Sequence, residues 1–532
     1  MSRRWLFAAS GAAAAAGLAV GAGTTAAVES GDSTEAGEFW PRAVEFVASA
    51  DQIAAPRVNG LHVQFGADSA REAVISWHST GPVRNPVVRF GTAAAGFGTT
   101  VQARTRAYKD AASGTEVHTH HARLTGLNPA TDYIYAAGHD GTSPELGTWR
   151  TAPAGRTAFR FTSFGDQGTP SVGKLVDGHY LNDNLGSPFA GDVTAGVERL
   201  APLFNLVNGD LCYANLATDR VRTWNDWWAN NSRSARYRPW MPAPGNHENE
   251  KGNGPIGYRA YQTYFTVPDS GAEELARGLW YSFTVGGMRL IALANDDICY
   301  QDGGNTYVRG YSGGAQQRWL EAELSKARAD RDIDWVVVFM HQTAVSSATR
   351  SNGADRAIRE LWLPLFDKYQ VDLVLCGHEH HYERSHPVRG VLGTGTLTPK
   401  PIPDAVTAGP GGPATDVIDT SKGTVHLVIG GGGTSSPSNG LLFPDKQCRV
   451  LTGVGDFDAA LNKKTPIYEP EQAPWSAFRD PEHPYGFCAF DVDPGKPGGN
   501  TTITATYYAL TGPASDLKPV DTFTLTRPRS DR

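Results

Sequence analysis

The sequence predicts two structural domains, an N-terminal all-β sandwich followed by a larger α/β domain. The chain has 532 residues, which is too many for a single hydrophobic core. Short alternating segments separated by turns fill residues 56–153, whereas apolar strands alternate with helical segments over residues 156–528. The 60 glycines and 34 prolines indicate long loops and β-structure rather than a helical bundle.

The first thirty residues are predicted to be an export signal. Arg3 and Arg4 precede a weakly apolar Ala/Gly stretch over residues 8–22, and the small residues 25–27 suit cleavage. A membrane anchor would need about 20 strongly apolar residues, which this stretch lacks. We expect a twin-arginine (Tat) signal over 1–30 and a connecting segment over 31–55. We also expect a secreted or cell-envelope protein with no integral membrane span after cleavage.

Charge and cysteine content narrow the classes of partner and scaffold. The formal net charge of −7 gives no basic surface for nucleic acid, so no nucleic acid is expected as a specific partner. Five scattered cysteines without a C-x-x-C pattern exclude a disulfide scaffold and a zinc knuckle. Cys212 and Cys299 each follow a strand toward the same edge and precede a Tyr, so we hypothesise that they form a disulfide. The oligomeric state is not predicted.

The sandwich prediction depends on alternating apolar residues and one turn motif. Residues 61–65 and 73–77 alternate cleanly, and residues 87–90 do so less cleanly. A Gly/Asn/Pro turn then precedes Tyr133, in the position of a tyrosine corner. This arrangement resembles a fibronectin type III-like sandwich. The histidines at 118, 120 and 121 lie on one predicted strand, and we interpret them as structural rather than metal-binding.

The α/β prediction depends on buried strands and amphipathic helices. The predicted strands span residues 159–164, 203–207, 335–339, 371–375 and 425–429. Helical spacing covers residues 315–328 and 354–369. A short linker over 151–155 separates these elements from the sandwich.

Polar motifs stand at the ends of strands in this second domain. They are Gly165-Asp166-Gln167-Gly168, Gly209-Asp210 with Tyr213, Gly245-Asn246-His247-Glu248, Met340-His341, and Gly377-His378-Glu379-His380. Ligand sites in open α/β sheets lie beyond the carboxyl ends of the strands, so we expect these side chains to converge. A lone Gly-Asp is usually a turn and a lone buried His is usually structural, but five such motifs in order are specific.

Oxygen and imidazole donors without cysteine suit Fe, Zn or Mn. Two metal ions about 4 Å apart activate a water and neutralise a phosphoryl group in transfer. A bridging carboxylate keeps two cations that close, and Asp210 is the candidate for this bridge.

The ordered motifs are similar to those of the purple acid phosphatases, within the calcineurin-like metallophosphoesterases. The resemblance covers most of the chain, including the fibronectin-like domain, residues 279–283 and 317–321, and Tyr382-Glu383-Arg384. It implies a metallophosphoesterase domain of two packed β-sheets flanked by helices. It also implies an exported, binuclear metal-dependent phosphatase that hydrolyses small phosphate monoesters by attack of a metal-bound hydroxide.

The resemblance further implies a role for each motif residue. Fe(III) in the first site would be held by Asp166, Asp210, Tyr213 and His380. Fe(II), Zn or Mn in the second site would be held by Asp210, Asn246, His341 and His378. Tyr213 is the most diagnostic ligand, because most other metallophosphoesterases lack it. His247 would contact substrate as the general acid, and Glu248 would orient the loop.

One departure from the family leaves alternatives open. Plant-type enzymes carry an adjacent pair of histidines after the motif that ends at His341, whereas residues 342–352 here contain no His. An acidic pH optimum is therefore not assured, and a phosphodiesterase or phospholipase C-like activity at the same metals remains an alternative. A non-catalytic cell-surface binding protein is disfavoured, because all seven ligand positions are filled.

Overall fold

The computed structural model describes most of the chain after residue 54. The described ranges are 55–170, 185–301, 308–350, 352–459, 463–512 and 516–531, with the paired strands β10 (Leu175–Val176) and β11 (His179–Tyr180) between the first two. The predicted Tat signal over 1–30 and the connecting segment up to residue 54 lie outside the described residues. Within the described ranges, no helix has the length and hydropathy needed to cross a membrane.

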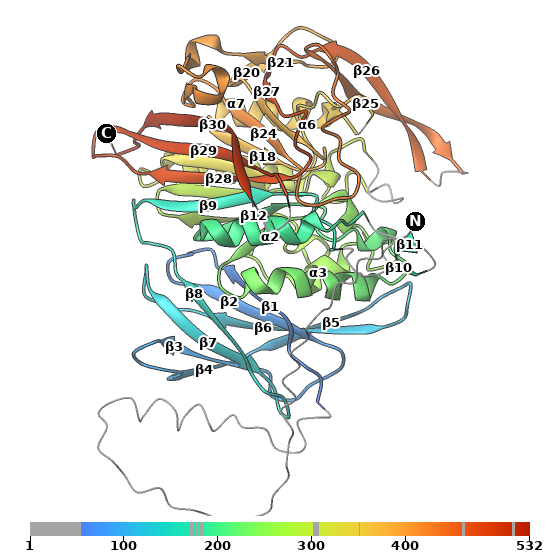
Figure 1. Cartoon of the computed structure of the whole chain (residues 1–532), viewed down its shortest axis with the longest axis vertical. Coiled ribbons are helices and arrows are strands. Elements are labelled where there is room, and N and C mark those ends of the chain that lie inside the picture. Colours follow the sequence, from blue (N-terminus) through green and yellow to red (C-terminus); the bar gives the residue numbers. More distant parts are fainter. Residues whose placement is uncertain are drawn as a thin grey trace, which may run out of the picture. The chain divides into compact units, whose positions relative to one another are not determined.

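The N-terminal domain is a β-sandwich of two antiparallel four-stranded sheets, with orders β1-β2-β6-β5 and β4-β3-β7-β8 (Figure 1). The strands are β1 (Asn59–Phe65), β2 (Ala73–Ser79), β3 (Val87–Thr92), β4 (Thr99–Gln102), β5 (Arg104–Lys109), β6 (Glu116–Leu124), β7 (Asp132–Gly138) and β8 (Glu145–Arg150). Trp77, Tyr135 and Trp149 fill the space between the sheets. The backbone N–H of Asn128 donates to the Tyr133 hydroxyl at 2.9 Å, which confirms the predicted tyrosine corner.

Two of the three histidines of β6, His120 and His121, have the structural partners that the prediction requires. His120 bonds the hydroxyls of Ser79 and Thr105, both at 2.8 Å, within the sandwich. His121 points to the other side of the strand, where it contacts the carbonyl of Thr263 in the second domain at 3.0 Å. β6 therefore contributes one imidazole to the sandwich and the next to the boundary between the two domains.

The second domain contains two large sheets. The first has eight strands in the order β13-β12-β9-β28-β29-β30-β23-β22, and the second has seven in the order β14-β15-β16-β18-β24-β19-β27. The strands of the first are β9 (Phe159–Phe164), β12 (Phe204–Asn208), β13 (Trp240–Ala243), β22 (Val406–Thr407), β23 (Val417–Asp419), β28 (Gly486–Asp493), β29 (Asn500–Leu510) and β30 (Leu517–Pro528). Those of the second are β14 (Tyr281–Val285), β15 (Met288–Ala292), β16 (Trp335–Phe339), β18 (Leu373–Cys376), β19 (Tyr382–Ser385), β24 (Val425–Ile429) and β27 (Ser476–Arg479).

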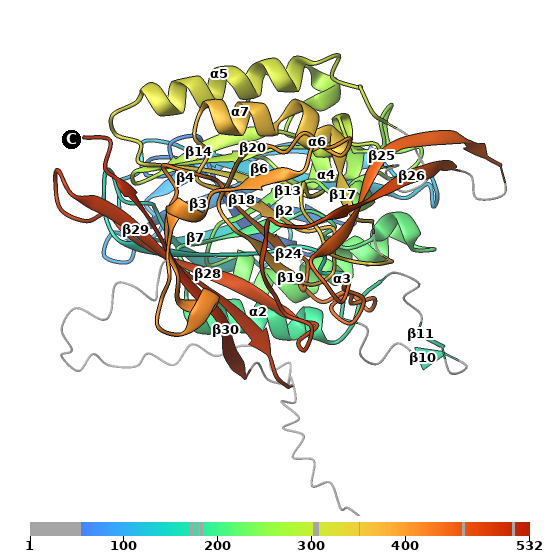
Figure 2. The same ribbon diagram turned by 90° about the horizontal axis from the view of Figure 1, so that it is seen from above.

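The main hydrophobic core lies between these two sheets. Phe161 and Phe490 of the eight-stranded sheet belong to the same buried cluster as Phe283 and Phe339 of the seven-stranded sheet. The helices are α2 (Phe189–Leu200), α3 (Arg220–Ala235), α4 (Arg259–Tyr264), α5 (Ala315–Ala329), α6 (Arg356–Leu361) and α7 (Leu363–Lys368). Figure 2 shows α5 and α7 along one side of the domain, where a second buried cluster packs under them. The predicted fold class, an all-β sandwich plus a two-sheet α/β domain flanked by helices, is confirmed.

The second domain also contains smaller β-elements. A three-stranded sheet consists of β17 (Ala354–Asp355), β25 (Gln447–Asp458) and β26 (Lys463–Gln472), and its long hairpin extends outward in Figure 2. The strands β20 (Val388–Val391) and β21 (Pro399–Pro401) form a separate pair.

Two expectations from the sequence are wrong in detail. The helix predicted over 354–369 is two short helices, α6 and α7, preceded by β17. Pro364 stands in the first turn of α7, and a proline lacks the N–H that would continue α6. The hypothesised Cys212–Cys299 disulfide is also wrong, because both residues are buried thiols. Cys212 lies in the core between the sheets, whereas Cys299 lies in the cluster under α5 to α7.

The direction of the strands positions the functional motifs. β9, β12 and β13 run parallel to one another in the first sheet, and β16, β18 and β24 do so in the second. Parallel neighbours end at the same edge of a sheet, so the loops that follow them meet there.

Candidate metal centre

Five loops bring the predicted ligands to this edge. Asp166 follows β9, Asp210 follows β12, and His341 and His378 follow β16 and β18. Asn246 opens the 3₁₀ turn η3 (Asn246–Glu248), which follows β13. The site therefore takes residues from both sheets.

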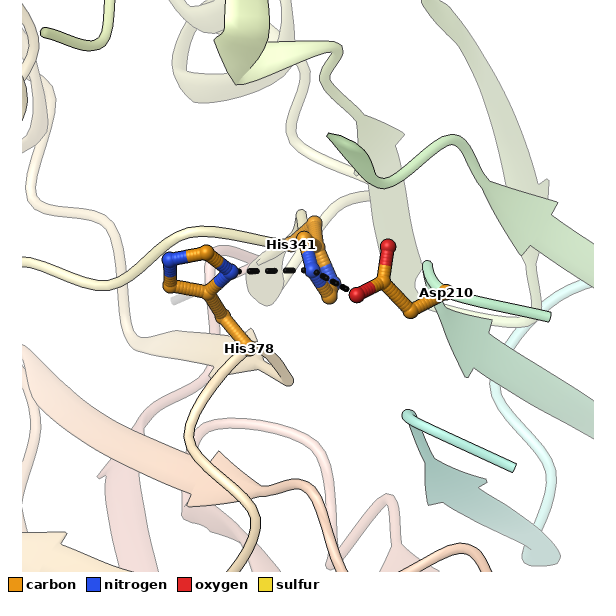
Figure 3. Close-up of side chains that lie close together, drawn as sticks. All are labelled: Asp210, His341 and His378. Carbon is orange, nitrogen blue, oxygen red and sulfur yellow. Dashed lines mark hydrogen bonds and ion pairs between the residues drawn. The ribbon is translucent and has the colours of Figure 1, made fainter. Parts of the chain in front are cut away.

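One cluster contains Asp210, His341 and His378, whose candidate ligand atoms lie within 4.8 Å of one another (Figure 3). Asp210 Oδ2 is 3.0 Å from His341 Nε2, and that atom is 3.1 Å from His378 Nδ1. Ligands about 2.0–2.2 Å from one ion are about 2.8–3.6 Å apart at tetrahedral or octahedral angles. Asn246 Oδ1 is buried and has no hydrogen-bond partner in the structure, which is unusual for a buried carbonyl oxygen. The donors of this cluster fit a metal ion.

A second cluster contains Asp166, Tyr213 and His380. The Tyr213 hydroxyl is 3.2 Å from Asp166 Oδ1 and 3.2 Å from His380 Nε2. The third separation, from His380 Nε2 to Asp166 Oδ1, is 3.4 Å. Three donors at these mutual distances also match ligands on one ion. The structure therefore brings six of the seven sequence-predicted ligands into two adjacent groups. The seventh, Asn246, precedes His247, whose backbone N–H bonds Asp210.

Backbone acceptors orient two of the imidazoles. His341 Nδ1 is 2.7 Å from the carbonyl oxygen of Asn208, and His380 Nδ1 is 2.6 Å from that of Ser436. A carbonyl oxygen only accepts, so each Nδ1 carries a hydrogen and each Nε2 is the nitrogen that faces its cluster.

His378 is held in the opposite orientation by a side chain. Its Nε2 donates to Gln301 Oε1, so its Nδ1 faces Asp210 and His341. Gln301 Nε2 in turn donates to Asn352 Oδ1 at 2.8 Å, which fixes which way the amide points. Asn352 Nδ2 closes the network on the carbonyl of His378 at 3.3 Å. Two neutral amides thus select the ligand nitrogen of His378.

Strained backbone concentrates at the site. Asp166, Asp210, Tyr213 and His378 have φ between 52° and 73°, in the left-handed region that non-glycine residues rarely adopt. They are four of the nine such non-glycine residues in the described part of the chain. Backbone conformations of this kind persist at functional sites because the surrounding structure enforces them.

Two motif glycines are required by contact with the carboxylates. A Cβ at Gly245 would lie 2.3 Å from Asp210 Oδ1, and a Cβ at Gly377 would lie 2.4 Å from Asp166 Oδ2. Both distances are far below van der Waals contact. The glycines that precede Asn246 and His378 therefore let these ligands approach the two aspartates.

The electrostatics favour cations. Burial alone would lower the pKa of His341, but the charges of Asp210 and Asp166 outweigh it and raise the pKa to about 10. Burial alone would raise the pKa of Asp210, and the neighbouring His341 and His247 lower it. The site thus stabilises positive charge next to buried carboxylates, which is the condition for holding a metal ion.

His247 lies beside both clusters. Its ring is 4.6 Å from that of Tyr213, and its Nδ1 is 2.9 Å from Asn215 Oδ1. Its backbone N–H donates to Asp210 Oδ1 at 2.8 Å. Its side chain is 19% exposed, against 0–3% for Asp210 and His341, so it is the member of the group nearest to solvent. Burial nevertheless lowers its pKa, although Asp210 opposes this.

Glu248 holds the loop, as expected from the sequence. Its carboxylate accepts the backbone N–H groups of Asp210, Leu211 and Gly245 at 2.7–2.9 Å. These bonds join the loops after β12 and β13, which carry Asp210 and Asn246. Glu248 therefore sets the distance between two ligand-bearing loops.

Several supporting residues could not be found from the sequence. Gln301, Asn352 and Asn215 belong to no motif, and the contributions of Asn208 and Ser436 are main-chain carbonyls. A backbone acceptor leaves no signal in residue identity. The stretch 342–352 contains no histidine, yet it supplies the amide that orients Gln301.

Both domains resemble known protein families. Residues 58–152 match the family of the purple acid phosphatase N-terminal domain, and residues 190–382 match the calcineurin-like phosphoesterases. An uncharacterized protein of Mycobacterium tuberculosis is 63% identical over 99% of this chain and 96% of its own length. A purple acid phosphatase of Glycine max is 29% identical over 55% of this chain and 60% of its own.

The solved structure of purple acid phosphatase PPD1 from yellow lupin seeds has the same fold, with a TM-score of 0.61 at 21% identity, over 90% of this chain and 75% of that one.

The chain is a calcineurin-like phosphoesterase that resembles the purple acid phosphatases and carries their N-terminal domain. The protein is accordingly a hydrolase with the fold of a metal-dependent phosphatase, and its resemblance to that family implies a binuclear metal site.

Removal of the Gln301 amide is predicted to weaken metal binding measurably. Gln301→Leu removes the acceptor of His378 Nε2–H, so the ring is no longer held with Nδ1 toward the cluster. We expect affinity for the metal of the second site to fall about 10- to 100-fold, as for other partners of metal-bound histidines. Metal content after dialysis against graded chelator measures this.

Gln301→Glu keeps an acceptor at the same place and is the matched control, which should retain its metal. Full metal retention by Gln301→Leu would show that Gln301 does not orient His378.

Proposed function

We propose that this protein is a purple acid phosphatase that hydrolyses small phosphate monoesters at a binuclear centre. Asp166, Asp210, Tyr213 and His380 would hold Fe(III) in the first site. Asp210, Asn246, His341 and His378 would hold Fe(II), Zn or Mn in the second. The chemistry that two bound ions supply is activation of a water and neutralisation of phosphoryl charge.

The observation that carries the proposal is the position of the Tyr213 hydroxyl between Asp166 and His380. Tyr213 occupies it with a left-handed backbone, which a residue without a role there would avoid. The monoester preference is supported by a relative from Allium cepa named phosphoenolpyruvate phosphatase, 27% identical over 69% of this chain. Phosphoenolpyruvate is itself a phosphate monoester.

His247 is suited to protonate the leaving oxygen. Asn215 Oδ1 accepts from Nδ1–H, which leaves Nε2 as the nitrogen that gains and gives a proton. Because burial lowers its pKa, the imidazolium is a stronger acid than an ordinary histidine. The contact from its backbone N–H to Asp210 keeps the ring beside the carboxylate proposed to bridge the metals.

We also propose that the enzyme is exported by the Tat route. This is supported by Arg3 and Arg4 ahead of the Ala/Gly stretch. N-terminal sequencing of protein recovered outside the cytoplasm should find a start near residue 28. Recovery of a chain that still begins at residue 1 or 2 would contradict it.

Metal binding and proton transfer should separate in two variants. Asp210→Asn should lose metal and nearly all activity together, because this carboxylate serves both sites. His247→Ala should keep both metals and lose about 10²- to 10⁴-fold in kcat on alkyl phosphates. Its loss should be smaller on nitrophenyl phosphate, whose leaving anion needs little protonation. Metal analysis beside rates on an alkyl monoester, nitrophenyl phosphate and a diester measures all of this.

Equal losses on activated and unactivated esters would leave His247 as a phosphate contact and not as the acid. Faster turnover of the diester by the wild type would favour the phosphodiesterase alternative.

The identity of the first metal has a visible signature. A phenolate bound to Fe(III) gives a broad charge-transfer band, so the oxidised iron-loaded enzyme should be coloured. Tyr213→Phe should bleach the band and leave the protein folded. A colourless iron-loaded wild type would mean that Tyr213 is not a ligand or that the first site selects another metal.

A further inference from the structure

We infer that the N-terminal β-sandwich is a positioning element of the catalytic centre, which holds the loop of Asn246 and His247 through Asp110. This inference rests on the proposed function, because it assigns His247 a role in catalysis. It gives the sandwich a task beyond packing against the second domain.

The loop after η3 ends in a buried polar cluster. Glu250 is fully buried, and its carboxylate accepts from Trp224 Nε1 at 2.6 Å and from Asn253 Nδ2 at 2.5 Å. The Asn253 backbone N–H also donates to the Glu250 carbonyl at 2.9 Å. Residues 250–253 thus form a closed turn, two residues downstream of Glu248.

Residues of the sandwich form hydrogen bonds with this turn from the other side. Asp110, fully buried between β5 and β6, accepts from Asn253 Nδ2 at 3.0 Å. The N–H of Ala111 donates to Asn253 Oδ1 at 2.8 Å, so both ends of the Asn253 amide are held by the sandwich. Ser113 fixes the other oxygen of Asp110 through its N–H and its hydroxyl, at 2.8 and 2.7 Å.

A positively charged side chain completes the junction, which is the set of contacts between Asp110 and the turn at 250–253. Arg220, the first residue of α3, lies 3.6 Å from Asp110 Oδ1 and donates to the Lys251 carbonyl at 3.0 Å. Burial would raise the pKa of Asp110, but the bonds from Ser113 and Asn253 and the charge of Arg220 lower it. The carboxylate is therefore charged at neutral pH, and its bonds to the loop are charge-assisted.

The junction is connected to His247 along two routes. Along the chain, Glu250 is three residues from His247, and Glu248 between them bonds the Asp210 loop. Through space, Asn215 orients the His247 ring from η2 (Ala214–Leu216), which precedes α3.

α3 itself rests on the sandwich, because Trp228 stacks on His62 of β1 with ring centroids 4.0 Å apart. Both the loop of His247 and the residue that orients its ring are therefore supported by the N-terminal domain.

Because the junction is buried, a change in its contacts shifts the loop that carries Asn246 and His247. A buried carboxylate that loses its donors is strongly unfavourable, so the loop cannot move away from Asp110 without an equivalent replacement. The hydrogen bond between Asp110 and Asn253 is called the clamp here. Removing it frees the turn at 250–253 and lets Asn246 and His247 shift. Displacement of a catalytic group by about 1 Å from a remote change costs up to about 100-fold in rate.

The test uses the full-length, metal-loaded enzyme. Asp110→Ala and Asn253→Ala should each lower kcat on an alkyl phosphate by about 10- to 100-fold, with KM close to wild type. The double variant should be no slower than the slower single variant, because both remove the same clamp.

Tyr135→Phe is the matched control. It deletes another hydrogen bond between the domains, from the Tyr135 hydroxyl to the Arg236 carbonyl at 2.8 Å, and should leave kcat unchanged. Asp110→Asn keeps the side-chain volume and serves if Asp110→Ala does not fold.

A second readout separates this inference from the proposed function. Amide hydrogen exchange over residues 246–253 should be faster in Asp110→Ala and unchanged in Tyr135→Phe, whether or not the wild type hydrolyses phosphate esters. A wild type without phosphatase activity would refute the proposed function, while faster exchange would still support the clamp. The inference would be overturned if both Asp110 variants had the same exchange rates and kcat as the wild type. It would also be overturned if Tyr135→Phe had effects as large as theirs.

Discussion

Asp166 and Asp210 are buried where the two sheets meet, and a buried carboxylate needs donors or cations around it. Asp210 is surrounded by His341 Nε2 and the N–H of His247, and Asp166 by the N–H of His378 and the Tyr213 hydroxyl. Each donor comes from a different loop. The need to compensate these two anions therefore gathers loops from both sheets at one point, and two metal ions would complete that compensation.

This arrangement imposes local strain that the rest of the fold must offset. A non-glycine residue held in the left-handed region costs about 1–3 kcal/mol, and four of the predicted ligands are held there. The apolar core between the sheets fixes the strand ends from which these residues project. The N-terminal sandwich adds a support through α3 and the turn at 250–253. Precision at the centre thus depends on elements that never touch it.

Much of this could be predicted from the sequence, for a physical reason. Apolar strands that end in Gly-Asp, Gly-Asn-His or Gly-His mark their own carboxyl ends, and parallel pairing carries those ends to one edge. Contacts that use main-chain carbonyls, such as Asn208 on His341, leave no trace in residue type. Gln301 and Asn352 come from loops without periodicity, and only tertiary structure places them beside His378.

The helix and the disulfide that the sequence predicts wrongly also have physical explanations. Pro364 interrupts an apolar periodicity that otherwise continues from α6 into α7. Cys212 and Cys299 occupy similar places after strands, but the seven-stranded sheet separates the clusters in which they lie. Position along a strand does not report on which face of a sheet a side chain is buried.

The network around His378 has one more consequence. Gln301 and Asn352 are amides, which neither gain nor lose a proton across the range in which proteins stay folded. The hydrogen bond that selects the ligand nitrogen of His378 is therefore insensitive to acid, whereas the ligands themselves compete with protons for metal. Had a carboxylate or a second imidazole stood at residue 301, acidification would have disturbed the shape of the centre as well as its occupancy. Around His378, the amides that maintain the geometry do not titrate, and the ligand that titrates does not set that geometry.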